Sequence, residues 1–165
     1  MATFVHLTPE RLVDRILRAG IRAGPTCWKV PDGVYAMPTT PNFFVSHQWL
    51  RELKRRGDRT FWGVYFRVPN DQLVYVGHYN ERHERMQAGE AAAMLFEADA
   101  ALGCEVIIPR GIAPGEIHRV RRLSQLAGWR YFPGAHGKAP CTCESCIRRG
   151  EYGARRIRDR FREGS

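Results

Sequence analysis

The 165-residue chain lacks any apolar run near the roughly 20 residues that a membrane-spanning helix needs. Its first residues also lack the basic stretch followed by an apolar stretch that characterises a signal peptide. We therefore expect a cytoplasmic protein with no membrane partner. Internal repeats are absent too, so an array of repeated units is not expected. The composition is 44% hydrophobic and 11% aromatic, which supplies enough apolar mass for a folded core and excludes wholesale disorder.

Acidic residues are scarce in the last quarter of the chain. The net charge is +9, from 26 Lys and Arg against 17 Asp and Glu. Residues 119–165 contain twelve basic and four acidic residues and thus carry +8, whereas residues 1–118 carry only +1. Such a cationic block attracts a phosphate backbone without reading its sequence. This Arg-rich C-terminal segment predicts a nucleic-acid partner, DNA or RNA; the alternative is a solvated tail without a partner.

Cysteines are few, but three of the five fall within six residues. Cys141, Cys143 and Cys146 are too close together for good disulfide geometry, and with His136 they offer four ligands in eleven residues. Zinc takes thiolate and imidazole ligands of this kind tetrahedrally, and a closed set of four is structural rather than catalytic. Cys27 is the alternative fourth ligand, and three reduced thiols in a loop are the alternative to a metal site.

Hydrophobic periodicity predicts an α+β domain over residues 1–133, followed by a zinc-binding, Arg-rich segment over residues 134–165. Thr8 is the expected N-cap of the first helix, with Pro9 at its first position and Gly20 at its end. The other expected elements are strands at 4–7, 33–37 and 104–109, a helix from about residue 46, a hairpin of 60–68 with 73–79, a helix at 82–102 and a basic helix at 152–161.

Three separated motifs occur in a characteristic order. They are His6-Leu7-Thr8 at a strand end, Gly33-Val34-Tyr35-Ala36 followed by Phe43 and Phe44, and Glu105 at the start of an apolar strand. In this order they resemble the ADP-ribosyltransferase superfamily over residues 4–120, with likeness to both its poly(ADP-ribose) polymerase branch and its DNA-targeting toxin branch. The resemblance implies a split β-sheet core with flanking helices, here followed by a small zinc-knuckle tail.

The resemblance also implies residue roles, with NAD as the substrate. Glu105 would stabilise the oxocarbenium-like ribose that forms as nicotinamide leaves, a role that suits a carboxylate. His6 would hold a ribose hydroxyl, the Leu7 backbone would hold the nicotinamide amide, and an aromatic ring would stack on the nicotinamide. The implied catalytic residues are Glu105, His6 and Tyr35, and the implied NAD-binding residues are His6, Leu7, Thr8, Gly33, Tyr35, Phe43 and Phe44. The acceptor of ADP-ribose stays open among nucleic acid, which we expect, protein and water.

A second resemblance concerns the middle of the chain. Gly63-Val64-Tyr65 and Tyr75-Val76-Gly77 are similar to the signature of the GIY-YIG nucleases, in which an Arg contacts phosphate and a carboxylate holds magnesium. The corresponding residues would be Tyr65, Tyr75, Arg85 and Glu97. A third interpretation is a zinc-stabilised nucleic-acid-binding module without catalytic activity.

The cysteine cluster predicts that the purified chain carries about one equivalent of zinc. Replacing Cys143 with Ser should release this zinc, because a site of four ligands loses most of its affinity with one thiolate. Metal analysis by mass spectrometry checks this, and His136→Ala compared with Cys27→Ala identifies the fourth ligand. A wild-type chain without zinc, purified in the absence of chelators, would contradict the prediction.

Overall fold

A computed structural model describes residues 1–26, 30–54, 58–79, 81–97 and 103–124 of the chain. The expected zinc ligands His136, Cys141, Cys143 and Cys146, the alternative ligand Cys27 and the whole segment 134–165 lie outside these residues. The zinc-knuckle tail and its predicted basic helix therefore stay predictions.

The described residues form a seven-stranded antiparallel sheet with short helices. The strands are β1 (Ala2–Pro9), β2 (Val34–Pro38), β3 (Phe61–Val68), β4 (Leu73–His78), β5 (Glu84–Gln87), β6 (Cys104–Ile108) and β7 (Ile117–Arg122). The helices are η1 (Glu10–Leu12), α1 (Val13–Ala19), α2 (Phe43–Ser46), α3 (Leu50–Leu53), α4 (Ala88–Glu97) and η3 (Pro114–Glu116). The predicted α+β class is confirmed, and no helix among the described residues is both long and apolar enough to cross a membrane.

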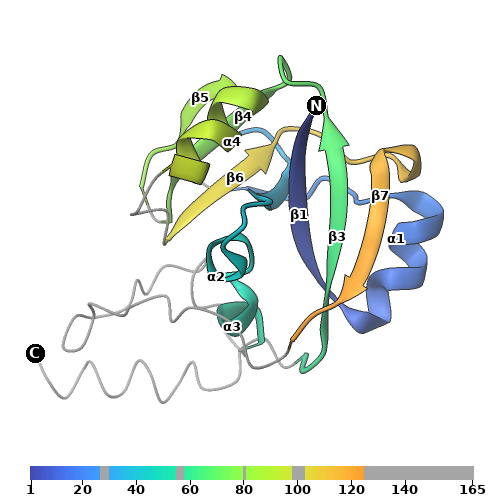
Figure 1. The fold of residues 1–165 in the computed structure, drawn as a ribbon. Helices are drawn as coiled ribbons and strands as arrows, with labels where there is room; N and C mark the ends of the chain where they lie inside the picture. The colour runs from blue at the N-terminus through green and yellow to red at the C-terminus, as the bar shows by residue number, and fades with distance from the viewer. Residues whose placement is uncertain (27–29, 55–57, 80, 98–102, 125–165) are drawn as a thin grey trace, which may run out of the picture.

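The strand order is β5-β4-β6-β2-β1-β3-β7, and the sheet consists of two halves that meet between β2 and β1. β1 pairs with β3 along its whole length, from Ala2 to Pro9, but with β2 only at Phe4 and Val5. Figure 1 shows the consequence, because β1, β3 and β7 stand side by side while β6 and β4 run across them. The narrow join between β1 and β2 lets the two halves diverge.

Strand burial follows the alternation of side chains in a sheet only in part. Successive residues Phe4 and Val5 of β1 are both buried, as are Val106, Ile107 and Ile108 of β6. Strands that bury both faces read as continuous apolar runs, and helices on both sides of a sheet produce this pattern. β7 is different, because its sequence Ile-His-Arg-Val-Arg-Arg has no buried residue and it ends the sheet.

The predicted hairpin of 60–68 with 73–79 is wrong. β3 pairs with β1 and β7, β4 pairs with β6 and β5, and three strands separate β3 from β4. The connection 69–72 is held instead by the first residues of α4, since Ala88 N–H donates to Gln72 O (2.8 Å) and Gly89 N–H donates to Asn70 O (2.9 Å). These bonds direct the chain from one half of the sheet to the other.

Two helix predictions also need correction. Residues 84–87 of the expected 82–102 helix form β5, because they pair with β4 along Leu73–Val76. The helix itself, α4, begins only at Ala88. The expected helix from residue 46 is two shorter helices, α2 and α3, the first of which begins at Phe43. Thr8 does not cap a helix, since it is paired with Trp62 within β1.

Gly20 ends α1 with a φ of +78°, a conformation that favours glycine. A methyl group at this position would also collide with the carbonyl oxygen of Ile112, which pairs with Ile21. We expect Gly20→Ala to lower the free energy of unfolding by about 2 kcal/mol or more. Gly24→Ala is the matched control, because its added Cβ would meet nothing within 4 Å. Urea-induced unfolding measures both, and equal stabilities would contradict the structure.

Candidate functional site

The three strands that carry the motifs are neighbours, in the order β6-β2-β1. His6 lies on β1, Tyr35 on β2 and Glu105 on β6, although 29 and 99 residues separate the first from the other two. Nδ1 of His6 lies 2.8 Å from the backbone oxygen of Tyr35. The structure therefore brings together the parts of the chain that the resemblance singled out.

The bond to Tyr35 determines the protonation of His6. A carbonyl oxygen only accepts hydrogen bonds, so Nδ1 of His6 carries the hydrogen and donates it. Burial lowers the pKa of His6 below its ordinary value of 6.5, while the bond to Tyr35 raises it in part. The imidazole is therefore neutral at neutral pH, and its Nε2 is an acceptor without a hydrogen-bond partner among the described residues.

Thr8 adds a second free polar atom beside His6. Residues two apart in a strand share a face, so Thr8 and His6 project from the same side of β1. The Thr8 hydroxyl is buried and has no hydrogen-bond partner in the part of the chain that the structure describes. A buried hydroxyl without a partner is costly in a native fold. The His-x-Thr motif thus presents two polar atoms that can bond a ligand hydroxyl.

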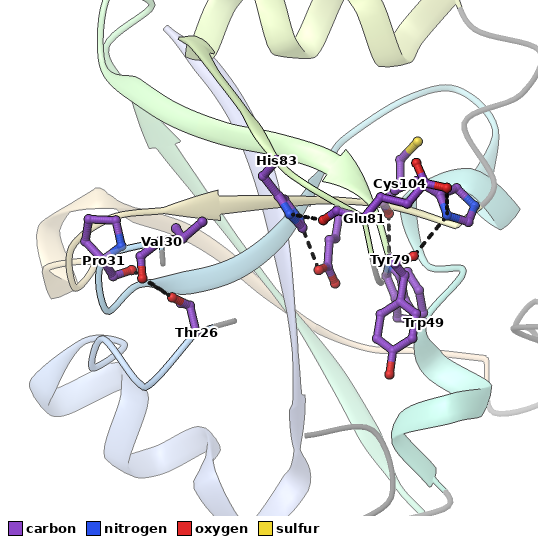
Figure 2. Close-up of polar contacts among 10 residues, drawn as sticks. Thr26, Val30, Pro31, Trp49, Tyr79, Glu81, His83 and Cys104 are labelled. Carbon is purple, nitrogen blue, oxygen red and sulfur yellow. Dashed lines mark hydrogen bonds and ion pairs between the residues drawn. The ribbon is translucent and has the colours of Figure 1, made fainter. Parts of the chain in front are cut away.

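Glu105 is buried, with 7% of its surface exposed, and it forms a pair with His83. Nε2 of His83 lies 3.1 Å from Oε1 of Glu105, and its Nδ1 lies 3.1 Å from the backbone oxygen of Glu81. Figure 2 shows the His83 ring beside Glu81, with the bond from Nδ1 to the Glu81 carbonyl dashed. Because Nδ1 faces the Glu81 carbonyl, Nε2 is the ring nitrogen of His83 that faces Oε1 of Glu105. The Oε2 atom has no hydrogen-bond partner among the described residues.

Gly77 explains why His83 can reach Glu105. Gly77 is paired with Glu105 across β4 and β6. A Cβ on Gly77 would lie 2.9 Å from Cγ of His83, so the imidazole rests directly on the glycine backbone. His83 could not be identified from the sequence. It precedes β5, and no local pattern predicts that its partner, Glu105, lies on β6.

The register places His6 and Glu105 on different faces at the join between the halves. Ala36 is paired with Val106, so the next step aligns Met37 with Glu105, and Met37 is paired with Val5. Residues opposite each other share a face, which puts Glu105 with Met37 and Val5, and His6 one residue further along. The β1–β2 ladder ends at Val5, and the His6 imidazole bonds the β2 backbone there instead. His6 thus borders the place where β1 and β2 separate, whereas Glu105 lies one strand beyond β2 and on the other face.

Residues 43–53 cover the face that carries Met37 and Glu105. Three consecutive side chains attach this segment, each to a different strand or strand end. Nε2 of His47 lies 2.8 Å from the Tyr65 hydroxyl on β3, and the Gln48 side chain accepts a bond from Gly103 N–H (2.5 Å) and contacts Met37. Trp49 Nε1 donates to the Cys104 carbonyl at 2.9 Å, and Figure 2 shows Trp49, Tyr79 and Cys104 grouped together.

The other predicted NAD-binding residues have structural partners or surroundings of their own. The Phe43 ring is stacked on His47, with 4.0 Å between centroids, and the Phe44 side chain lies outside the described atoms. Leu7 packs against Leu50 and Phe61. Gly33 is a glycine for steric reasons, because an added Cβ would lie 2.5 Å from the Ile108 oxygen. The Thr26 hydroxyl donates to Val30 O, and Figure 2 shows both residues apart from His83.

The structure separates the residues that the nuclease alternative requires. Tyr75 is paired with Arg85 across β4 and β5, but Tyr65 lies on β3 in the other half of the sheet. Glu97 is exposed at the end of α4. Without the predicted hairpin, the two tyrosine motifs do not lie on adjacent strands.

The described residues contain no group of three or more His, Cys, Asp or Glu that could hold a metal ion, and Cys104 is a free thiol. Comparisons with protein-family models, with curated proteins and with solved structures found no match for this chain. The proposal for its function therefore depends on the arrangement of its own residues.

Two histidines predict how stability depends on pH. Burial lowers the pKa of both His6 and His47, so the unfolded chain binds protons more readily than the folded chain. The free energy of unfolding is therefore highest above about pH 6.5. It decreases as the pH falls below that value, by at most about 1.4 kcal/mol per pH unit for each histidine. The lowered pKa values of Asp58 and Glu116 act at lower pH, below the ordinary 3.8 and 4.5 of these carboxyls.

Urea-induced unfolding between pH 8 and pH 5 measures this dependence. We expect a constant free energy of unfolding above pH 7 and a decline between pH 6.5 and pH 5. His47→Gln should reduce the slope of that decline, whatever its effect on stability at pH 8. An unfolding free energy that stays constant down to pH 5 would contradict the burial of these imidazoles.

Proposed function

We propose that the protein is an NAD-dependent ADP-ribosyltransferase that releases nicotinamide and transfers ADP-ribose to nucleic acid. The observation that carries the proposal is the adjacency of β6, β2 and β1 at the join between the two halves of the sheet. This adjacency brings the strands that carry Glu105, Tyr35 and His6 side by side from distant parts of the sequence.

The His-x-Thr motif offers groups that suit the ribose of NAD. Nε2 of His6 is an acceptor with its tautomer fixed by Tyr35, and a ribose hydroxyl is a donor. The unpartnered Thr8 hydroxyl on the same side of β1 can both donate and accept. A bound sugar would satisfy two polar atoms that have no partner in the described part of the chain.

Glu105 suits the chemical step. When the bond between nicotinamide and ribose breaks, its electron pair leaves with nicotinamide and positive charge develops on the ribose. A fixed carboxylate stabilises that charge most effectively in a site shielded from water, where electrostatic interactions are strong. The acceptor then bonds to the ribose carbon and loses a proton. Oε1 of Glu105 is held by His83, so Oε2 is the oxygen left for the ribose or the acceptor.

His83 would act as a positioning residue in this reaction. Its side chain is fully buried and rests on Gly77, so it cannot turn away from Glu105 without unpacking. Because the Glu105 carboxylate is already held in one rotamer, no entropy is lost in ordering it when the substrate binds. This lowers the activation free energy of the reaction.

The test of the proposal is nicotinamide release from NAD labelled in the adenosine, with single-stranded DNA, RNA or protein extract as acceptor. Glu105→Gln should lower the rate of release by a factor of about 1,000, because it removes the negative charge. The amide keeps a hydrogen bond to His83, so the melting temperature should change little. Glu84→Gln, an exposed carboxylate on β5, is the matched control and should keep full activity.

Label in nucleic acid identifies the acceptor that we propose, whereas nicotinamide release without transfer to any of the three would identify water. A wild-type chain that binds oligonucleotides but releases no nicotinamide would refute the proposal and favour a non-catalytic binding module.

A further inference from the structure

Tyr65 lies on β3, in the half of the sheet that does not contain β6, and its hydroxyl is bonded by the buried His47. The distance from Nε2 of His47 to the Tyr65 hydroxyl is 2.8 Å, and Nδ1 of His47 lies 3.0 Å from the Phe43 carbonyl. The carbonyl accepts, so Nδ1 carries the hydrogen and Nε2 of the neutral ring accepts the phenol hydrogen. His47 is 4% exposed. The hydrogen bond to buried His47 thus fixes the orientation of the Tyr65 ring.

Two arginines of β7 flank this ring on the same face. Tyr65 is paired with Arg119 and Gly63 with Arg121. The Tyr65 ring leans over Gly63, since a Cβ there would lie 3.2 Å from the phenol oxygen. The phenol therefore lies toward Arg121, while the guanidinium carbon of Arg119 is 5.8 Å from the ring centroid. Electrostatic interaction with Arg121 also lowers the pKa of His47, in addition to burial.

These arginines have no carboxylate partner among the described residues, and both are exposed. β7 contains no acidic residue, and it is the last strand in the sheet order. Two residues along an extended strand span roughly 7 Å, so both guanidinium groups can face one chain of phosphates. Guanidinium groups bind phosphate oxygens through paired, charge-assisted hydrogen bonds.

We propose that Arg119 and Arg121, oriented by Tyr65, bind the phosphate backbone of a single-stranded nucleic acid. A polymer fits better than the single diphosphate of NAD because the sequence after β7 is basic as well, with nine basic and four acidic residues in 125–165. An aromatic ring beside the arginines is also typical of surfaces that bind single strands.

The site lies in line with Glu105. The register aligns Arg119, Tyr65, Val5 and Met37 across neighbouring strands, and Glu105 is the next step. At about 4.8 Å between strands, Glu105 is roughly 14 Å from Tyr65, and residues 43–53 cover the face between them. The role of the bound nucleic acid as the acceptor of ADP-ribose rests on the proposed function. Its binding to Arg119 and Arg121 does not.

The test measures binding of a fluorescent single-stranded oligonucleotide, as DNA and as RNA, by anisotropy with the full chain and without NAD. The double variant Arg119→Gln/Arg121→Gln should weaken binding about tenfold and reduce the slope of log K against log salt by roughly 1.4. Arg122→Gln controls for the other face of β7. Arg85→Gln controls for an arginine paired with a tyrosine on the opposite edge strand, β5.

Each control should change the dissociation constant less than twofold. Equal losses in the double variant and in a double control of Arg85 and Arg122 would overturn the site, because binding would then follow total charge. Unchanged oligonucleotide binding together with a raised KM for NAD would also overturn it and assign the arginines to the NAD diphosphate. Loss of binding in a chain that never releases nicotinamide would support the site while refuting the transferase.

Discussion

The narrow contact between β1 and β2 is the constraint on which the rest of the structure depends. Only Phe4 and Val5 of β1 form ladder pairs with β2, so backbone hydrogen bonds alone join the two halves of the sheet weakly. The imidazole of His6 and the bond from Thr39 N–H to Thr3 O (3.0 Å) add to this join. The join itself is packed, because Phe4, Val5 and Met37 are buried in the hydrophobic core, and His6 lies just beyond the end of the ladder.

The segment that contains α2 and α3 connects the two halves of the sheet. His47, Gln48 and Trp49 bond Tyr65, Gly103 and Cys104, and thus connect β3 with the start of β6 across the face of β1 and β2. Buried polar groups contribute to a unique structure when every one has a partner. These three side chains meet that condition, whereas the hydroxyl of Thr8 does not.

The two proposals use the same face of the sheet in different ways. Glu105 is shielded and held by His83, as a group that acts on developing charge should be. Arg119 and Arg121 are exposed on an edge strand, where they can meet a large anionic partner and also discourage pairing with another sheet. The first proposal thus depends on a buried carboxylate and the second on exposed guanidinium groups.

The sequence by itself determined the α+β class, the strands at 4–7, 33–37 and 104–109, and the cationic character of residues 119–165, because periodicity, turn residues and charge are local properties. It also predicted the first, second and third motifs through their order along the chain. Tertiary structure alone decided that β3 and β4 lie in different halves, that residues 84–87 form a strand, and that His83 and His47 hold Glu105 and Tyr65. Strand pairing and side-chain contacts between distant segments decided these features, and the free energy of such contacts is not encoded in any short stretch of sequence.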